Sequence, residues 1–178
     1  MYLRGNKKMT NHIVLFEPLM PANTGNIART CAGTNSVLHL IKPLGFEIND
    51  KTVKRAGLDY WDKVEIKYHD NLPAFLDSLP NLARLFIVSK FAPRDYSEPD
   101  YSVSDEDNYF LFGKETTGLP EPFMRQYADK AIRIPQNDDN IRALNLSNSV
   151  AIVIYEALRQ QNYNGLDLVH LYDNDKLK

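Results

Sequence analysis

The 178-residue chain is predicted to form a single α/β domain whose largely parallel β-sheet is covered by helices on both faces. Apolar runs typical of strands alternate along the chain with segments of helical character. Several of these runs are continuously apolar, which is typical of parallel strands buried on both sides. The length suits one domain, and the shares of hydrophobic residues (43%) and charged residues (25%) are those of a soluble globular protein.

Six segments rich in β-branched and aromatic side chains, each bounded by turn residues or polar residues, are predicted to be strands. They are residues 12–17, 37–41, 64–68, 84–89, 108–113 and 131–135. Short helices are expected between them at residues 25–33, 49–57, 72–79 and 121–128. Pro21, Asn23 and Thr24 supply turn and capping chemistry for the first of these helices.

The stretch 141–159, IRALNLSNSVAIVIYEALR, begins with short polar side chains and continues into an apolar run from Val150 to Tyr155. The β-branched residues of this run also suit a core strand. The good helix formers that follow, the lack of Gly or Pro, and a cap from Asn145 or Ser147 favour a helix. Because a helix that is apolar on nearly all sides needs cover on nearly all sides, we expect the sheet on one face and a second subunit on the other.

Cysteine, histidine and charge limit the classes of function. The one cysteine, Cys31, stands among small and apolar residues, so we interpret it as a packed core thiol rather than a nucleophile. The four histidines, His12, His39, His69 and His170, stand singly without the spacing of zinc ligands, which argues against metal catalysis. The formal net charge of −2 argues against indiscriminate binding of nucleic acid but is compatible with a local basic patch.

The sequence gives no sign of a membrane segment or a signal peptide. No apolar run approaches the roughly 20 residues that span a bilayer, and the start MYLRGNKKMTNH lacks an apolar core. We therefore expect a cytoplasmic protein. Residues 1–11 are expected to form a flexible basic extension in which Met9 is an alternative start, followed by one domain at 12–163 and a tail at 164–178.

Three loops of unusual polar or glycine content, 21–26, 113–120 and 135–148, follow predicted strands. The carboxyl ends of parallel strands meet at one edge of a sheet, where ligands collect, so these loops are expected to form a site together. The sequence GKETTGLP at 113–120 matches neither the phosphate-binding loop nor the dinucleotide-binding pattern. Taken alone, its glycines fit both the close approach of a ligand and a tight strand-to-helix turn.

Four motifs occur in order within residues 11–162: PxNTGNxxRxC from Pro21, KPLGF followed by RAGLDYW from Lys42, FGxExxGLP from Phe112, and IRxLNLSNSVAIVxYE from Ile141. Together they make the chain resemble the SPOUT family of S-adenosylmethionine-dependent RNA methyltransferases. Within that family it is most similar to the minimal group that methylates the ribose 2'-hydroxyl at the wobble position of tRNA. Such an ordered set of motifs is more specific than any single glycine pattern.

The resemblance implies that the C-terminal part of the chain threads through a loop to form a deep trefoil knot, an exception to the rule that chains are unknotted. In this family the knot holds the methyl donor, S-adenosylmethionine, largely through backbone groups, and no metal is required. Related proteins often have serine at the position of Ala143, so backbone recognition is expected there. Carried onto this sequence, the residues expected to form the donor pocket are Val88, Gly113, Ile134, Ala143, Leu144, Asn145 and Ser147.

Catalytic roles are implied for a second group of residues. Arg29 is expected to face the reacting ribose, and because a guanidinium stays protonated, we interpret it as a phosphate or alkoxide stabiliser rather than a base. Asn26 and Asn23, on the same loop, are expected to fix the substrate or Arg29. Glu115 is expected to order its loop or to bind the donor. Arg142 is a second candidate for phosphate binding, and Tyr155 is expected to reach the partner's site across a dimer. The alternative to these functional roles is a purely structural one: Asn26 and Glu115 would be caps, and Tyr155 would be a core residue.

A basic cluster is a candidate for contact with tRNA. Lys51, Lys54 and Arg55 lie near Tyr60 and Trp61, and cations beside aromatic rings can hold phosphates and stack an unpaired base. A solvated helix face is the alternative interpretation.

The leading hypothesis is a homodimeric cytoplasmic enzyme that methylates the ribose 2'-hydroxyl of the wobble nucleotide, a cytidine or modified uridine, in the anticodon region of tRNA. Neither a membrane nor DNA is expected as a partner. Methylation of another tRNA or rRNA position is an alternative, and a non-catalytic RNA-binding protein of the same fold is another. The intact Arg29, Asn145 and Ser147 argue against the non-catalytic alternative, and an oxidoreductase would need a phosphate-binding pattern that the chain lacks.

Overall fold

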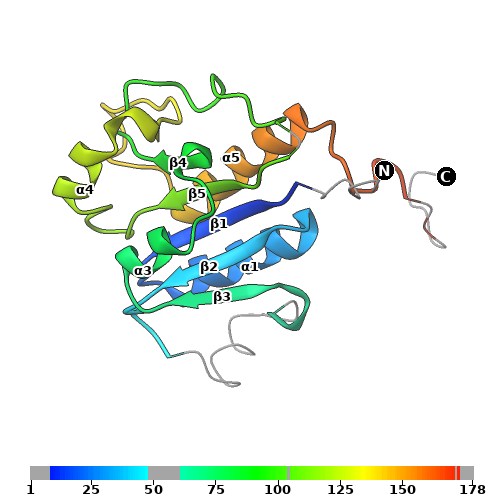
Figure 1. The fold of residues 1–178 in the computed structure, drawn as a ribbon, viewed down its shortest axis with the longest axis horizontal. Helices are drawn as coiled ribbons and strands as arrows, with labels where there is room; N and C mark the ends of the chain where they lie inside the picture. Colours follow the sequence, from blue (N-terminus) through cyan, green and yellow to red (C-terminus); the bar gives the residue numbers. More distant parts are fainter. Residues whose placement is uncertain (1–8, 48–60, 104, 171, 173–178) are drawn as a thin grey trace, which may run out of the picture.

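A six-stranded parallel sheet forms the centre of the molecule (Figure 1). The computed structural model describes residues 9–47, 61–103, 105–170 and 172. The strands are β1 (Asn11–Phe16), β2 (Val37–Ile41), β3 (Ile66–His69), β4 (Leu85–Val88), β5 (Asn108–Phe112) and β6 (Ala131–Ile132). Their order is β3-β2-β1-β5-β4-β6, and each neighbouring pair is parallel. The predicted parallel α/β architecture is confirmed.

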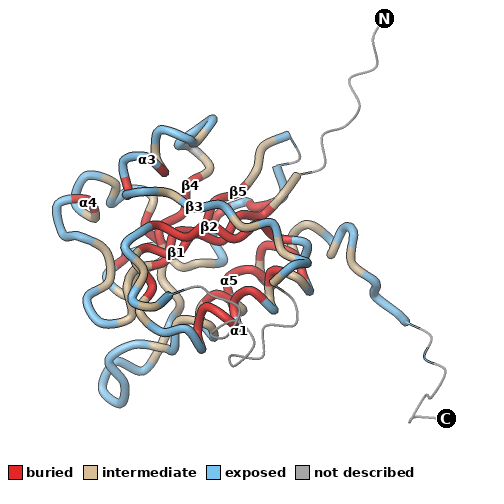
Figure 2. The backbone as a smooth tube through the Cα atoms, turned by 90° about the horizontal axis from the view of Figure 1, so that it is seen from below, coloured by how far each residue is buried: buried red, intermediate tan, exposed pale blue. Residues whose placement is uncertain are grey.

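Helices cover both faces of this sheet (Figure 2). On one face lie α1 (Pro21–Thr34) and α5 (Leu146–Gln160), which pack against each other, and on the opposite face lie α3 (Leu72–Asp77) and α4 (Glu121–Gln126). The short 3-10 helices η1 (Trp61–Lys63), η2 (Leu82–Arg84) and η3 (Ala128–Lys130) lie in the connections.

The central strands contribute side chains to two cores. On β1, Ile13 and Leu15 join the core formed with α1 and α5, whereas Val14 and Phe16 join the core formed with α3 and α4. Every residue of β1, β2 and β5 is buried. Full burial of one aliphatic side chain stabilises the fold by about 1.5–3 kcal/mol, so a continuously apolar strand gains on both of its faces. β3, at the edge, is only partly buried.

Helix α1 begins four residues before its predicted start. Proline is favoured in the first helical turn, where its missing N–H costs no hydrogen bond, and Pro21 occupies that position. Asn23 and Thr24 are therefore buried inside the helix rather than capping it, and Met20 takes the cap position without a side-chain hydrogen bond. By contrast, β3, β4, β5, α3 and α4 match the predicted elements to within two residues at each end.

Two strands differ from prediction at their ends. β1 begins at Asn11, inside the predicted flexible extension, because the N–H of Asn108 on β5 donates to the carbonyl oxygen of Thr10 at 3.1 Å. β6 has two residues where a five-residue strand was predicted. The chain leaves the ladder at Arg133, which forms an isolated bridge with Asp95 instead.

Helix α5 confirms the helix predicted for the C-terminal stretch. Its N-cap is Asn145, whose Oδ1 accepts from the N–H groups of Ser147 at 2.9 Å and Asn148 at 3.3 Å. Ile152 and Tyr155 remain 36% and 50% exposed, so a single chain covers only one face of the helix. Cover by a second subunit stays a prediction. The residues that α5 buries are Val150, Val153, Ile154, Ala157 and Leu158.

Cys31 is buried in α1, and burial raises the pKa of its thiol to about 12. Since the thiolate is the reactive form, the predicted core thiol is confirmed. In the part of the chain that the structure describes, no helix is both long enough and apolar enough to cross a lipid bilayer.

Three histidines that are far apart in the sequence form one hydrogen-bonded chain between the sheet and α3. His12 Nδ1 lies 2.8 Å from His39 Nε2, and His39 Nδ1 lies 2.8 Å from His69 Nε2. The parallel register produces this proximity: His39 pairs with Val14, two residues from His12, and His69 pairs with Ile41, two residues from His39. The interpretation of these histidines as isolated residues is therefore wrong. Among the described residues, no group of three or more His, Cys, Asp or Glu is arranged to hold a metal ion.

Candidate active site

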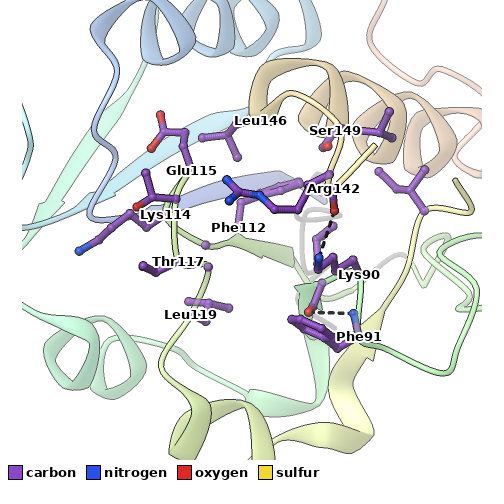
Figure 3. A pocket seen from close by; sticks show the side chains of 18 of the residues that line it. Lys90, Phe91, Phe112, Lys114, Glu115, Thr117, Leu119, Arg142, Leu146 and Ser149 are labelled. Carbon is purple, nitrogen blue, oxygen red and sulfur yellow. Dashed lines mark hydrogen bonds between the residues drawn. The ribbon is translucent and has the colours of Figure 1, made fainter. Parts of the chain in front are cut away.

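A cavity of about 310 Å³ lies at the carboxyl edge of the sheet, where the loops after β4, β5 and β6 meet the start of α5 (Figure 3). This volume is typical of a small-molecule site. Two of the three loops expected to form a site, 113–120 and 135–148, contribute directly to its wall. The loop 21–26 does not line the cavity but is hydrogen-bonded, through Asn23, to residues of the other two loops.

The loop after β5 closes tightly on itself. The Lys114 N–H donates to the Gly118 carbonyl oxygen at 3.2 Å, and the Gly118 N–H donates to the Lys114 carbonyl oxygen at 2.9 Å. Gly118 has a φ of 71°, in the left-handed region. A Cβ on Gly113 would lie 2.5 Å from the carbonyl carbon of Gly118 and 2.7 Å from the nitrogen of Leu119, so no larger residue fits. The backbone of this loop thereby becomes part of the cavity wall.

Glu115 anchors the same loop to the start of α1. Its Oε2 accepts from the Leu19 N–H at 2.9 Å, and its Oε1 accepts from the Met20 N–H at 3.2 Å and from Asn23 Nδ2 at 3.2 Å. A carboxylate is favoured beside the positive end of a helix. Of the two roles expected for Glu115, these contacts correspond to the ordering of its loop.

Asn23 continues this network to the third loop. Its Oδ1 accepts from Asn145 Nδ2 at 3.1 Å, while its own amide nitrogen donates to Glu115. Asn23 is buried, and Asn145 caps α5 at the same time. The hydrogen-bond chain Glu115–Asn23–Asn145 therefore joins three of the four sequence motifs and fixes α1, the glycine loop and α5 relative to one another.

Cationic side chains border the cavity. Figure 3 shows Arg142 extending over Phe112 into the cavity. Lys90 Nζ donates to the carbonyl oxygen of Arg142 at 3.1 Å, and Lys114 forms an ion pair with Glu17. The Arg142 guanidinium forms no hydrogen bond or ion pair with another described residue. It is therefore available to bind an anion.

The loop that carries Arg142 is held in place by Arg133. The Arg133 guanidinium donates to the carbonyl oxygen of Lys90 and forms an ion pair with Asp138. Hydrogen bonds from Gln136 and Arg133 lower the pKa of Asp138, so this carboxylate stays ionised at neutral pH. The loops after β4 and β6 are thus connected on the outer side of the cavity.

The predicted site residues fall into three places. Asn145 and Ser147 lie at the cap of α5 rather than in the cavity wall, where Ser147 Oγ donates to Asn145 Oδ1 at 2.7 Å. Asn26, Arg29 and Tyr155 lie on exposed helix surfaces, and the structure does not bring them to this chain's cavity. The predicted residues that line the cavity are Val88, Gly113, Glu115, Ile134, Arg142, Ala143 and Leu144.

Sequence reasoning missed several residues of the cavity wall. Lys90 and Phe91 follow β4 directly, and this position at the carboxyl end of a buried strand was the one available signal for them. The connecting role of Asn23 depends on side-chain contacts between distant segments, and no local pattern indicated it.

The expected tRNA-binding cluster lies mostly outside the described residues. Lys51, Lys54, Arg55 and Tyr60 belong to the segment 48–60. Trp61 is described, in η1, and it packs against the core formed with α1 and α5. The Trp61 ring thus has a core contact, which agrees better with a packing role than with base stacking.

Comparison with known proteins assigns this geometry to a family. The model of the SpoU rRNA Methylase family matches residues 10–155, and the chain belongs to this family. A Lactobacillus gasseri protein, provisionally named an RNA (cytidine(34)-2'-O)-methyltransferase, is 62% identical over 170 residues, which cover 96% of this chain and 91% of that protein. The predicted family and fold class are confirmed, while the knot itself stays a prediction.

Solved structures show the same fold. One, reported for structural insights into the 2-OH methylation of C/U34 on tRNA, is 41% identical and has a TM-score of 0.78, with 86% of this chain and 97% of that chain covered. The AdoMet-bound rRNA methyltransferase from Sinorhizobium meliloti has a TM-score of 0.73 and covers 86% of this chain and 57% of its own. At 24% identity, that likeness concerns the fold alone.

Proposed function

We propose that this protein transfers a methyl group from S-adenosylmethionine to the ribose 2'-hydroxyl of the wobble nucleotide of tRNA, a cytidine or a uridine-type nucleotide. The observation that carries the proposal is the near-full-length similarity to a relative named for cytidine 34 2'-O-methylation. The three motif loops of this chain, hydrogen-bonded into one site, support it. A cytoplasmic location is proposed with it, because that is where tRNA is found.

The cavity suits the donor in size and chemistry. Val88, Ile134 and Leu144 supply apolar surface for a flat base, and the loop from Gly113 supplies backbone groups at close range. S-Adenosylmethionine, when bound, supplies an activated methyl group on a sulfonium. Because Glu115 directs its carboxylate to α1, its main task in this proposal is to hold the loop rather than to move a proton.

The acceptor ribose has to be held in line with the methyl group, and positioning of this kind lowers the barrier strongly. Arg142 and Lys90 border the cavity and can bind the phosphates next to the reacting ribose. A guanidinium stays protonated and therefore stabilises the developing alkoxide or a phosphate rather than accepting the proton. In this proposal the methyl–sulfur bond breaks as the bond between methyl and ribose oxygen forms, the demethylated donor leaves, and the hydroxyl proton passes to water.

A second copy of the chain would complete the site. Arg29 and Asn26 lie on the exposed surface of α1, and Ile152 and Tyr155 lie on the exposed surface of the adjacent α5. None of these residues lines the cavity of its own chain. We infer that two copies pack through α1 and α5, which covers the apolar side chains and carries Arg29 to the partner's cavity.

The decisive experiment is mass spectrometry of tRNA nucleosides. Cells that lack the protein should lose the 2'-O-methyl group at the wobble position, and purified protein with S-adenosylmethionine should restore it in vitro. Loss at another tRNA or rRNA position would replace the proposed substrate. A protein that binds tRNA, gives no calorimetric signal with the donor and restores no methyl group would be the non-catalytic RNA-binding alternative.

A further inference from the structure

Phe91 stands on a hydrogen-bonded turn at the border of the cavity, yet the residue is 82% exposed. The turn follows β4 and is closed by a hydrogen bond from the Ala92 N–H to the Ser89 carbonyl oxygen at 3.2 Å. The Phe91 N–H donates to Ser89 Oγ at 3.3 Å, and the Ser89 N–H donates to the Ile132 carbonyl oxygen at 2.9 Å. A well-held turn thus presents a large aromatic ring to solvent.

Three cationic side chains line the hollow beside this ring: Lys90, Arg133 and Arg142. Lys90 Nζ lies 5.0 Å from the centroid of the Phe91 ring, and the Arg133 guanidinium donates to the carbonyl oxygen of Lys90. Figure 3 shows Lys90 next to Phe91. Arg142 borders the same space. An apolar protein partner would need a wider apolar patch, whereas an aromatic ring among cations is the combination that binds bases and phosphates of single-stranded nucleic acid.

The ring separates two hollows. Phe91, Lys90 and Arg142 line both the donor cavity and a second hollow of about 500 Å³ outside it. The second hollow is also lined by Asp139 and Asn140, whose polar groups can meet the hydrogen-bonding edge of a base. A base in this hollow would therefore belong to a nucleotide next to the one whose ribose meets the donor, or to that nucleotide itself.

Resting on the proposed function, we propose that the second hollow binds an unpaired base of the tRNA anticodon loop and that Phe91 is the surface on which this base stacks. Lys90 and Arg142 bind the adjoining phosphates. The ring contributes mainly to RNA affinity and to the position of the target ribose. Because it lines the donor cavity only at its border and is 82% exposed, its contribution to donor binding is the smaller one.

The test compares Phe91→Ala, Phe91→Trp and the wild type. Phe91→Ala should weaken binding of an anticodon stem-loop RNA by about 5- to 150-fold, the range that corresponds to loss of one base–aromatic stack. Calorimetry with S-adenosylmethionine should show a smaller change in affinity for Phe91→Ala than the change in its RNA affinity, and Phe91→Trp should bind RNA as the wild type does. Val103→Ala, at an exposed apolar position outside both hollows, is the matched control and should change nothing.

A stacking role has its own spectroscopic signature. We expect the fluorescence of 2-aminopurine, placed at the wobble position of a stem-loop RNA or beside it, to be quenched when the RNA binds the wild type. Binding to Phe91→Ala should not quench it. The inference would be overturned by equal RNA binding of Phe91→Ala and wild type, or by equal losses of RNA affinity in Phe91→Ala and Phe91→Trp. A loss of donor affinity in Phe91→Ala as large as its loss of RNA affinity would overturn it too. A wild-type protein that neither binds nor methylates the RNA would overturn the proposed function instead.

Discussion

At Gly113 and Gly118, the same added methyl group meets two different obstacles. Gly118 has a positive φ but open space around it, so Gly118→Ala should cost the roughly 1–2 kcal/mol of a left-handed alanine. At Gly113 the new Cβ would lie 2.5 Å from backbone, so Gly113→Ala should displace the loop and cost more. Urea unfolding and donor calorimetry on both variants measure the difference.

The contrast tests whether the glycine loop shapes the donor cavity. Gly118→Ala should retain donor binding within a few-fold, because the backbone path needs little change. Gly113→Ala should lose at least tenfold in donor affinity, because the displaced backbone is part of the wall. Similar losses for both variants would mean that conformational preference, rather than the close backbone contact, governs this loop.

At the scale of elements, Asn145 both caps α5 and donates a hydrogen bond to Asn23 of α1, and the substitution Asn145→Asp can separate these two roles. Asn145→Ala removes the N-cap of α5 and should lower stability by about 1 kcal/mol. Asn145→Asp keeps an oxygen that accepts from the N–H groups of Ser147 and Asn148, and its negative charge is favoured at the positive end of the helix, so stability should be retained. The aspartate side chain, however, has no N–H to donate to Asn23 Oδ1. If the Asn23 amide rotated to donate to the aspartate, its oxygen would face the Glu115 carboxylate and the hydrogen bond to Glu115 would be lost.

Methylation by Asn145→Asp should therefore fall by tenfold or more while its thermal unfolding stays close to that of the wild type. The pair of measurements distinguishes a broken connection between α1 and α5 from a weakened helix. Full activity in Asn145→Asp would show that the hydrogen bond to Asn23 is dispensable for positioning the loops.

At the scale of the whole molecule, the chain of three histidines across β1, β2 and β3 makes stability depend on pH. Burial lowers the pKa of His12 from 6.5 to about 4 and that of His39 to about 2, and it also lowers the pKa of His69. The unfolded chain takes up these protons first. The free energy of unfolding is therefore unaffected by protonation of these histidines above about pH 6.5. It falls as the pH is lowered toward 4, by about 1.4 kcal/mol per pH unit for each histidine that titrates.

Urea unfolding between about pH 7.5 and pH 4.5 measures this slope. His39→Leu should be less stable at neutral pH, because it leaves nitrogens of His12 and His69 without a partner, but its stability should fall less steeply with acid. His170→Gln, at an exposed position, should keep the wild-type slope. Asp107, 3.7 Å from His12 Nε2, opposes the effect of burial without cancelling it. An unchanged slope in His39→Leu would assign the pH dependence to other groups.

The proposed dimer is also tested at this scale. Because Tyr155 is 50% exposed in one chain, Tyr155→Lys should leave the fold of the monomer intact but weaken association by tenfold or more. Light scattering should find about twice the chain mass of 20.4 kDa for the wild type and for Val103→Lys, a matched exposed apolar position. A wild type that is monomeric at micromolar concentration would contradict the shared site.

Some features followed from sequence because their causes are local or involve pattern. Buried strands need continuous apolar residues, a helix cap needs a short polar side chain such as Asn145, and a thiol among apolar residues becomes core, as at Cys31. The ordered motifs indicated the family, and seven of the residues that the family resemblance implied for the site line one cavity. The predicted end of β6 was wrong because Arg133 forms a bridge with Asp95 and a hydrogen bond with Lys90, contacts between distant segments that no local pattern shows.

The sequence by itself determined the fold class, the family and the loops that form the cavity, because hydrophobic periodicity and motif order are properties of the chain. Tertiary structure alone decided which side chains meet. It directed Glu115 to α1 through Asn23, left Arg29 and Tyr155 on the outer surface of α1 and α5, and aligned His12 with two other histidines. The physical reason is that hydrogen bonds and stacking act over a few ångströms, between residues that only strand register and helix packing bring together.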